Sequence, residues 1–179
     1  EGLFKYCKTS GSAYPSIIGS GENATILHYT VNDDTCDDGE VILIDAGCEY
    51  NGYASDITRS WPVNGKFSEA QAEIYQIVLD AQLAAIDQCR VGNTYDAPHN
   101  AARRVLAEGL IRIGVIAQDL EEALGPNGDL KNWYMHNTGH WLGKSFINAT
   151  THLWQRTSPC PELVDLIETG DFEVYLLFP

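Results

Sequence analysis

The sequence predicts an α+β fold, an antiparallel sheet followed by helices that pack on one face of that sheet. Two observations carry this prediction: a hairpin turn signal at residues 51–52 between strand-like segments, and helical apolar spacing between residues 68 and 114. Hairpin strands followed by helices are typical of α+β layers. The 179 residues are 44% hydrophobic and carry no repeat, which is enough chain for one domain with a sizeable core.

The hairpin signal is the Asn-Gly pair at residues 51–52, which favours a two-residue type I′ turn. A turn at this position places Tyr50 opposite Tyr53, and Asp45 opposite Thr58. Because the turn sets the register of a hairpin, the same pairing is expected to extend along both strands.

Two aspartates in this hairpin, Asp45 and Asp56, are the most informative residues of the chain. The predicted register places Gly47 opposite Asp56, so both carboxylates share one face as diagonal neighbours, about 7–8 Å apart at Cα. Two anions this close repel each other unless a cation lies between them. The pair is therefore interpreted as a metal site. The alternative is that each aspartate is a hydrogen-bonded residue at a strand end.

Three histidines are candidates to join this site. His136 and His140 are four residues apart, but the Asn-Thr-Gly between them is poor helix sequence. Asn137 also stands where a zincin helix carries glutamate, so a loop or strand is expected to present the two histidines. His28 ends another apolar segment. For each histidine taken alone, a hydrogen-bonded structural role is the alternative.

The middle of the chain is predicted to be helical. A capping-box pattern followed by apolar helical spacing predicts a first helix over residues 68–89. A second helix is expected over residues 96–113, and a short third helix over residues 117–124. His99 falls in the first turn of the second helix and is interpreted as a surface residue.

Composition limits the classes of partner. A net charge of −14 disfavours nucleic acid and anionic membranes, since both repel an acidic surface. No apolar stretch reaches membrane-spanning length. Five cysteines without a Cys-x-x-Cys pair indicate a reducing compartment, so a cytoplasmic location is expected.

Five motifs, in this order, resemble the Xaa-Pro aminopeptidases. They are GSGEN with ILHY within residues 19–29, IDAGCEY at 44–50, YASDITR at 53–59, VNGKF at 63–67 and MHNTGHWLG at 135–143. That group belongs, with prolidase and methionine aminopeptidase, to the metallopeptidases of the pita-bread fold. The likeness covers about residues 13–143 and residues 144–179 diverge, so residues 1–179 are interpreted as a partial catalytic domain with an incomplete pita-bread fold.

The resemblance implies two divalent ions, usually manganese in this branch with zinc or cobalt as alternatives, held by two Asp, one His and two Glu. Asp45, Asp56 and His140 match ligands, and Asp56 matches the aspartate that both metals share. His28 and His136 match histidines that contact substrate and stabilise the transition state. The implied substrate is a peptide with proline in second position, which loses its first residue. A homo-oligomer is left open.

The sequence also departs from the family pattern. A further family histidine is replaced at Ile147, and a glutamate ligand position falls on Leu176, with Glu173 nearby on the opposite strand parity. The family's last glutamate lies beyond the end of the chain, so three of five ligands are visible. Two alternatives to a peptidase follow: a pseudoenzyme or binding module that kept the fold, and a creatinase-like hydrolase, against which the three retained ligands argue.

Overall fold

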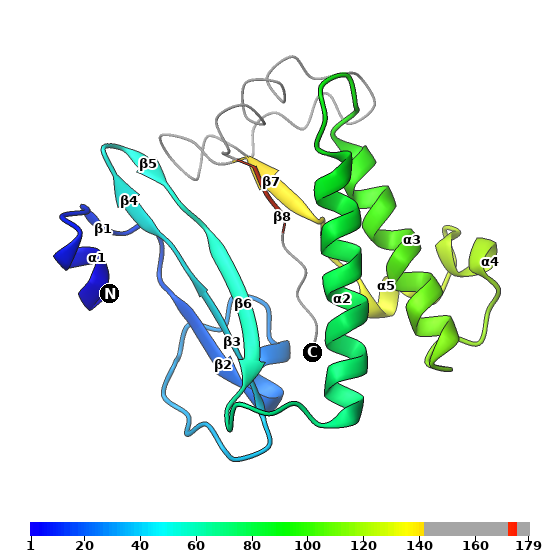
Figure 1. The fold of residues 1–179 in the computed structure, drawn as a ribbon, viewed down its shortest axis with the longest axis horizontal. Coiled ribbons are helices and arrows are strands. Elements are labelled where there is room, and N and C mark those ends of the chain that lie inside the picture. Colours follow the sequence, from blue (N-terminus) through cyan, green and yellow to red (C-terminus); the bar gives the residue numbers. More distant parts are fainter. Residues whose placement is uncertain (142–171, 175–179) are drawn as a thin grey trace. The chain divides into compact units, whose positions relative to one another are not determined.

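Strands fill the first part of the chain and helices the second, in agreement with the predicted α+β class (Figure 1). The computed structural model describes residues 1–141 and 172–174. The chain divides into two units: the described part of the first is Glu1–Ala72 with Trp141, and that of the second is Glu73–His140 with residues 172–174.

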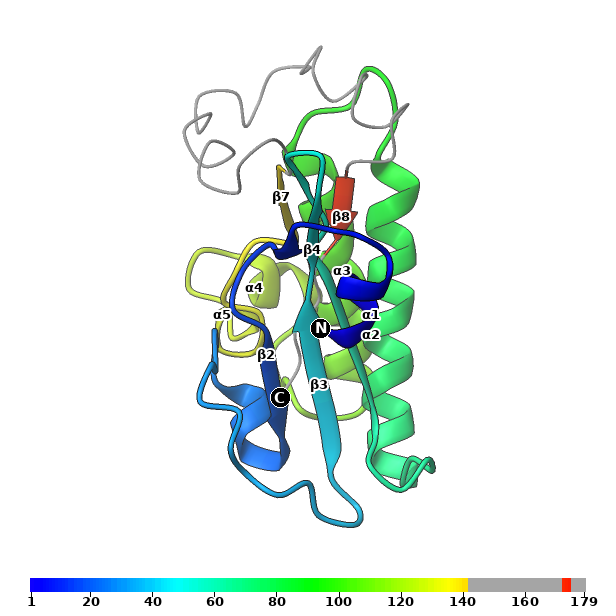
Figure 2. The ribbon, with the colours of Figure 1, turned by 90° about the vertical axis from the view of Figure 1, so that its left-hand side faces the viewer.

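The first unit contains two small antiparallel sheets, with strand orders β2-β3-β6 and β1-β4-β5. Figure 2 shows β2 lying alongside β3. Strands β3 and β4 form one arm of a long hairpin, and β5 and β6 form the other. The elements of this unit are α1 Gly2–Tyr6, β1 Gly11–Ser12, β2 Ile17–Ser20, the 3-10 helix η1 Gly21–Thr25, β3 Val41–Ala46, β4 Cys48–Tyr50, β5 Tyr53–Ala54 and β6 Ile57–Pro62.

A side-chain amide closes the outer edge of β2. Asn32 Oδ1 accepts from the backbone N–H of Ile18 at 2.8 Å, and Asn32 Nδ2 donates to the carbonyl of Ser16, also at 2.8 Å. An amide side chain has the same donor and acceptor groups as a peptide unit. Asn32 therefore takes the place of a neighbouring strand at this point of the edge.

The second unit is mainly helical, and the three predicted helices are confirmed. Its elements are α2 Glu69–Gln88, whose first residues lie in the first unit, α3 Asp96–Arg112, α4 Leu120–Leu124, α5 Leu130–Trp133, β7 Gly139–Trp141 and its partner β8 Phe172–Val174. The predicted capping box starts α2: Ser68 N–H donates to Gln71 Oε1 at 2.9 Å, and Gln71 N–H donates to Ser68 Oγ at 3.2 Å. The helix α5 was not predicted from the sequence, since four residues are too short for a periodic pattern.

Small and branched apolar side chains fill the core of the second unit. On α2, Ile77 is 2% exposed and the alanines one and two turns later are fully buried. Leu106 and Leu110 on α3 pack into the same cluster, and Leu130 and Tyr134 extend it towards β7. The apolar spacing of both helices thus faces one shared core, as the sequence predicts.

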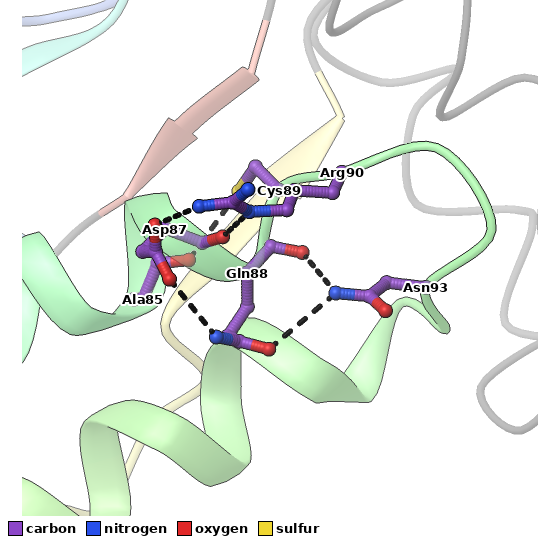
Figure 3. Close-up of polar contacts among 6 residues, drawn as sticks. All are labelled: Ala85, Asp87, Gln88, Cys89, Arg90 and Asn93. Carbon is purple, nitrogen blue, oxygen red and sulfur yellow. Dashed lines mark hydrogen bonds and ion pairs between the residues drawn. The ribbon is translucent and has the colours of Figure 1, made fainter.

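Side chains from the following turn donate hydrogen bonds to the last carbonyls of α2 (Figure 3). Arg90 Nε donates to the Asp87 carbonyl at 2.6 Å, and Asn93 Nδ2 donates to the Gln88 carbonyl at 2.7 Å. Arg90 also forms an ion pair with the exposed Asp87 carboxylate. Because the last carbonyls of a helix lack helical partners, these bonds fix where α2 ends, and the positive charge complements the helix dipole.

No helix in the described part of the chain is both long enough and apolar enough to cross a membrane.

The contact between α2 and α3 predicts that Gly109→Ala lowers the free energy of unfolding by about 1–3 kcal/mol. A Cβ at this position would lie 2.4 Å from Cγ2 of the buried Ile77. The overlap is expected to outweigh the helix propensity of alanine, which favours the variant by about 1 kcal/mol. Urea unfolding followed by circular dichroism measures the difference.

Glu108→Ala is the matched control, because residue 108 is exposed on the same helix. It should change stability by less than about 0.5 kcal/mol. In an Ile77→Ala background the Gly109→Ala substitution should cost less, since the overlapping atoms are gone. An equal cost in both backgrounds would contradict the contact.

Candidate metal centre

The Asn-Gly turn at residues 51–52 sets the geometry of the candidate site. Its two residues have positive φ, 52° and 84°, which a type I′ turn requires at both central positions. Tyr50 pairs with Tyr53, and Asp45 pairs with Thr58. Both predicted pairs are therefore confirmed.

The two arms of the hairpin approach closely at Gly47, two residues beyond Asp45 towards the turn. Gly47 and Asp56, expected opposite each other, both lie in a short gap between the regular ladders of β3–β6 and β4–β5. A Cβ on Gly47 would lie 1.7 Å from the Ser55 carbonyl oxygen and 3.0 Å from Cε1 of Tyr14. No side chain fits there, so glycine is what allows the two aspartates to approach.

Asp45 and Asp56 converge on a single hydroxyl group. Asp45 is on β3, Asp56 directly precedes β6, and Tyr14 precedes β2. The Tyr14 hydroxyl lies 2.5 Å from Asp45 Oδ1 and 2.6 Å from Asp56 Oδ1. Because one oxygen contacts both carboxylates, they share one face, which confirms the geometry predicted from the hairpin register.

The two carboxylates share one hydroxyl proton, and this affects their protonation. Burial raises the pKa of Asp45, and the nearby Asp56 charge raises it further, whereas the hydrogen bond from Tyr14 opposes the shift. Burial and the two carboxylates also raise the pKa of Tyr14, so its hydroxyl stays protonated. Asp56 is only 3% exposed. Without a cation, this arrangement favours a proton held between the two carboxylates.

The donor set fits a divalent cation, although it is incomplete. Carboxylate oxygens suit hard divalent ions such as Mn²⁺, and two of them converge here. Thr58 lies opposite Asp45 in the register, and its side chain favours the ionised form of that carboxyl by lowering the pKa of Asp45. Within residues 1–141 and 172–174, no cluster of three or more His, Cys, Asp and Glu is arranged to hold an ion. The two aspartates alone therefore could offer two ligands to an ion, and their role as metal ligands stays a prediction.

His136 and His140 belong to the second unit, on the segment that leads into β7. His140 lies on β7 and His136 in the loop between α5 and β7, so the expected loop or strand presentation is confirmed. The His136 Nδ1 atom is 2.8 Å from the Asn137 carbonyl oxygen. The positions of the two units relative to one another are undetermined, so the approach of His140 to Asp45 and Asp56 stays a prediction.

His28 lies in the turn after η1, with an exposed side chain and a φ of 56°. The backbone conformation is the left-handed one that asparagine, aspartate and histidine tolerate better than most residues. The structure thus places His28 in an accessible turn of the first unit, and its contact with substrate stays a prediction.

Sequence reasoning missed two residues of these sites. Tyr14 lies 31 and 42 positions from the two aspartates it contacts. His99, interpreted as a surface residue, is instead half-buried, with Nδ1 2.9 Å from Thr138 Oγ1 across 39 positions. That interpretation was wrong because local periodicity carries no signal for contacts of such long range.

Two of the divergent positions, Ile147 and Leu176, lie outside the described residues. Glu173 falls on β8, of which only the backbone is described. The contribution of a glutamate from this region to the site stays a prediction.

A family model for metallopeptidase family M24 matches residues 2–163. The chain belongs to this family. The resemblance drawn from the sequence motifs is therefore confirmed.

Curated relatives of this M24 chain include Xaa-Pro aminopeptidases from bacteria and animals. The Escherichia coli K12 Xaa-Pro aminopeptidase is 46% identical over 136 residues, which cover 74% of this chain and 31% of the relative. Xaa-Pro aminopeptidase 3 of Rattus norvegicus is 33% identical over 167 residues, which cover 92% of this chain and 32% of the relative. The chain thus spans about a third of the length of these relatives.

Solved structures show the same likeness in three dimensions. The Pseudomonas aeruginosa aminopeptidase PepP superposes with a TM-score of 0.77 and 46% identity, covering 79% of this chain and 32% of PepP. Zinc-substituted E. coli aminopeptidase P in complex with product gives 0.76 and 42%, covering 79% and 32%. The M24 chain therefore has part of the pita-bread fold of the aminopeptidase P catalytic domain.

The close approach at Gly47 predicts that Gly47→Ala is among the most destabilising single substitutions in the first unit, by about 3 kcal/mol or more. The added Cβ would overlap a backbone carbonyl, which cannot rotate away as a side chain does. Chemical denaturation measures the loss. Gly2→Ala is the control, because a Cβ there meets nothing within 4 Å. Equal effects of the two substitutions would show that the approach is not tight.

The repulsion between the carboxylates predicts opposite effects of Asp45→Asn with and without metal. In EDTA the free energy of unfolding of the variant should be higher by about 1–2 kcal/mol. The neutral amide can donate a hydrogen bond to Asp56, whereas two carboxylates at this distance repel each other. With Mn²⁺ the variant should lose the increase in melting temperature that the unsubstituted chain shows. Thermal unfolding in both buffers measures this. A variant that is less stable in EDTA and keeps its response to Mn²⁺ would contradict the site.

Proposed function

We propose that this chain carries part of the catalytic site of a metal-dependent Xaa-Pro aminopeptidase. The observation that carries the proposal is the convergence of Asp45 and Asp56 on one point, 2.5 and 2.6 Å from the same hydroxyl oxygen. Membership of the M24 family and relatives named Xaa-Pro aminopeptidase support the choice of reaction.

In this proposal Asp45, Asp56 and His140 are metal ligands, with Asp56 shared between two ions. Both aspartates are held in place by β3 and β6, so their oxygens are positioned before any ion binds. Divalent ions bound there would act as Lewis acids and lower the pKa of a water molecule that attacks the peptide carbonyl. The Tyr14 hydroxyl would then orient one carboxylate as an outer hydrogen-bond donor.

The hydrogen bond of His136 limits its role. A carbonyl oxygen only accepts, so Nδ1 must donate to Asn137, and in the neutral ring Nε2 then carries the lone pair. That nitrogen is buried without a hydrogen-bond partner among the described groups. It can accept from the amino group of a substrate, whereas donating to a developing oxyanion would require a second ring proton. We therefore assign His136 to the substrate amine, and His28 to a substrate contact.

The metal and the location are part of the same proposal. Carboxylate ligands with one imidazole suit manganese, and zinc is a compatible alternative because a relative has been solved with zinc. The expected substrate is a peptide with proline second, which would lose its first residue. The cysteine pattern supports a reducing compartment, with the cytoplasm as the proposed location.

A second candidate function is a binding module that keeps the fold without catalysis. Two substitutions favour it: Ile147 and Leu176 stand where the family resemblance places a histidine and a glutamate ligand. A module of this kind would still hold proline-containing peptides but would not hydrolyse them.

Metal titration beside a peptidase assay separates the two functions. The 179-residue chain should bind about one Mn²⁺ weakly in calorimetry, since three ligands hold a single ion but only Asp56 is available to bridge two. It should show little or no release of alanine from Ala-Pro peptides. Robust turnover by this chain would contradict the proposed ligand set.

The same assay on a longer chain that supplies both family glutamates tests the reaction itself. That chain should cleave Ala-Pro peptides, and Asp56→Asn should reduce cleavage to background by removing the shared ligand. Asp80→Asn, the same chemical change at an exposed position on α2, is the control and should leave cleavage unchanged. An inactive longer chain in excess manganese would favour the binding module.

A further inference from the structure

The first turn of α3 makes two hydrogen bonds to the segment that carries His136 and His140. The Tyr95 hydroxyl donates to the Gly139 carbonyl at 2.8 Å, and His99 Nδ1 lies 2.9 Å from Thr138 Oγ1. Tyr95 and His99 are four residues apart, so they lie one above the other on the same helix face. They therefore contact two successive residues directly before His140.

A buried hydroxyl lies at the centre of this contact. Thr138 is 2% exposed, and its Oγ1 is hydrogen-bonded to the hydroxyl of Tyr134 as well as to His99. Tyr134 is 6% exposed, and its ring lies between two imidazoles, with centroids 5.4 Å from His99 and 5.2 Å from His136. The Tyr134 ring thus contacts both imidazoles, and Thr138 joins Tyr134 to His99 through its hydroxyl.

The protons in this cluster have one arrangement that uses every donor. Burial raises the pKa of Tyr134 to about 12, so its hydroxyl carries a proton at neutral pH. That proton is satisfied if Tyr134 donates to Thr138 and Thr138 donates to His99 Nδ1. His99 then accepts at Nδ1 and carries its own proton on Nε2.

The ring of His136 is hydrogen-bonded to the peptide group that joins Asn137 to Thr138. The carbonyl that accepts from His136 Nδ1 belongs to Asn137, and it lies in the same plane as the backbone nitrogen of Thr138. Anchoring Thr138 on α3 therefore fixes the direction of this carbonyl. The carbonyl in turn sets which ring nitrogen of His136 carries the proton.

We propose that Tyr95 and His99 are positioning residues, which anchor the peptide before His140 on α3 and thereby hold His136 as the Nδ1–H tautomer with a bare Nε2. The inference deepens the proposed function, on which the roles of His136 and His140 rest. The geometry of the anchor itself depends only on contacts within the second unit.

Side-chain nitrogen spectroscopy of the ¹⁵N-labelled 179-residue chain tests the anchor without activity or metal. At about pH 8, His136 should appear as the Nδ1–H tautomer and His99 as the Nε2–H tautomer. Thr138→Val keeps the shape of the side chain and removes the hydroxyl. We expect it to lower the ratio of Nδ1–H to Nε2–H at His136 roughly fivefold or more, the factor expected for loss of one hydrogen bond.

Thr138→Ser is the matched control, because it keeps the hydroxyl, and it should retain the ratio of the unsubstituted chain. Tyr95→Phe removes the second hydrogen bond, the one to the Gly139 carbonyl, and should also lower the ratio. This variant provides a test if Thr138→Val does not fold. An unchanged His136 tautomer in a folded Thr138→Val or Tyr95→Phe variant would overturn the proposal.

Titration of the same samples with Zn²⁺ separates the anchor from the proposed function. A shift of the His140 ring nitrogens in the unsubstituted chain, weakened about tenfold or more in Thr138→Val, would support both, since partners that orient a ligand typically contribute that much affinity. If His140 does not respond to Zn²⁺ while the tautomer of His136 follows the hydroxyl of residue 138, the ligand assignment fails and the anchor stands.

Discussion

The repulsion between the half-buried Asp45 carboxylate and the buried Asp56 carboxylate is the constraint on which the first unit depends. Asp45 and Asp56 are brought together by a hairpin whose arms touch at Gly47, and a single hydroxyl from Tyr14 lies between them. Burial and the neighbouring Asp56 charge raise the pKa of Asp45, so holding both groups ionised costs free energy that a bound ion would offset. At this site, stability and metal affinity are therefore expected to change in opposite directions. A substitution that reduces the repulsion should raise the stability of the fold and weaken metal binding.

In the second unit, the side chains that must be held in place are imidazoles rather than carboxylates. A histidine ring needs its second nitrogen fixed if the first is to act in one defined state. The unit provides this through the Asn137 carbonyl for His136 and the Thr138 hydroxyl for His99. In the ligand set that we propose, the hairpin thus provides the charged carboxylates. The segment anchored on α3 provides a neutral imidazole.

Local signals in the sequence predicted the hairpin strands and the helices α2, α3 and α4, whereas the long-range contacts could not be predicted from it. The Asn51-Gly52 pair fixed the turn and the register, because both residues tolerate positive φ, and the Ser68 capping box marked the start of α2. Tyr14 and His99 could not be assigned this way, since their partners come from segments more than 30 positions away. The short helix α5 escaped for a third reason, since one turn has no period to detect.

The side-chain amide of Asn32 has a consequence for how copies of this protein meet. An exposed strand edge offers a row of free backbone groups, on which a strand of another molecule can add. At β2 the Ile18 N–H and the Ser16 carbonyl are already taken by one side chain of the same molecule. A strand of another molecule would have to displace that amide before it could extend the sheet. Asn32 therefore disfavours aggregation through this edge.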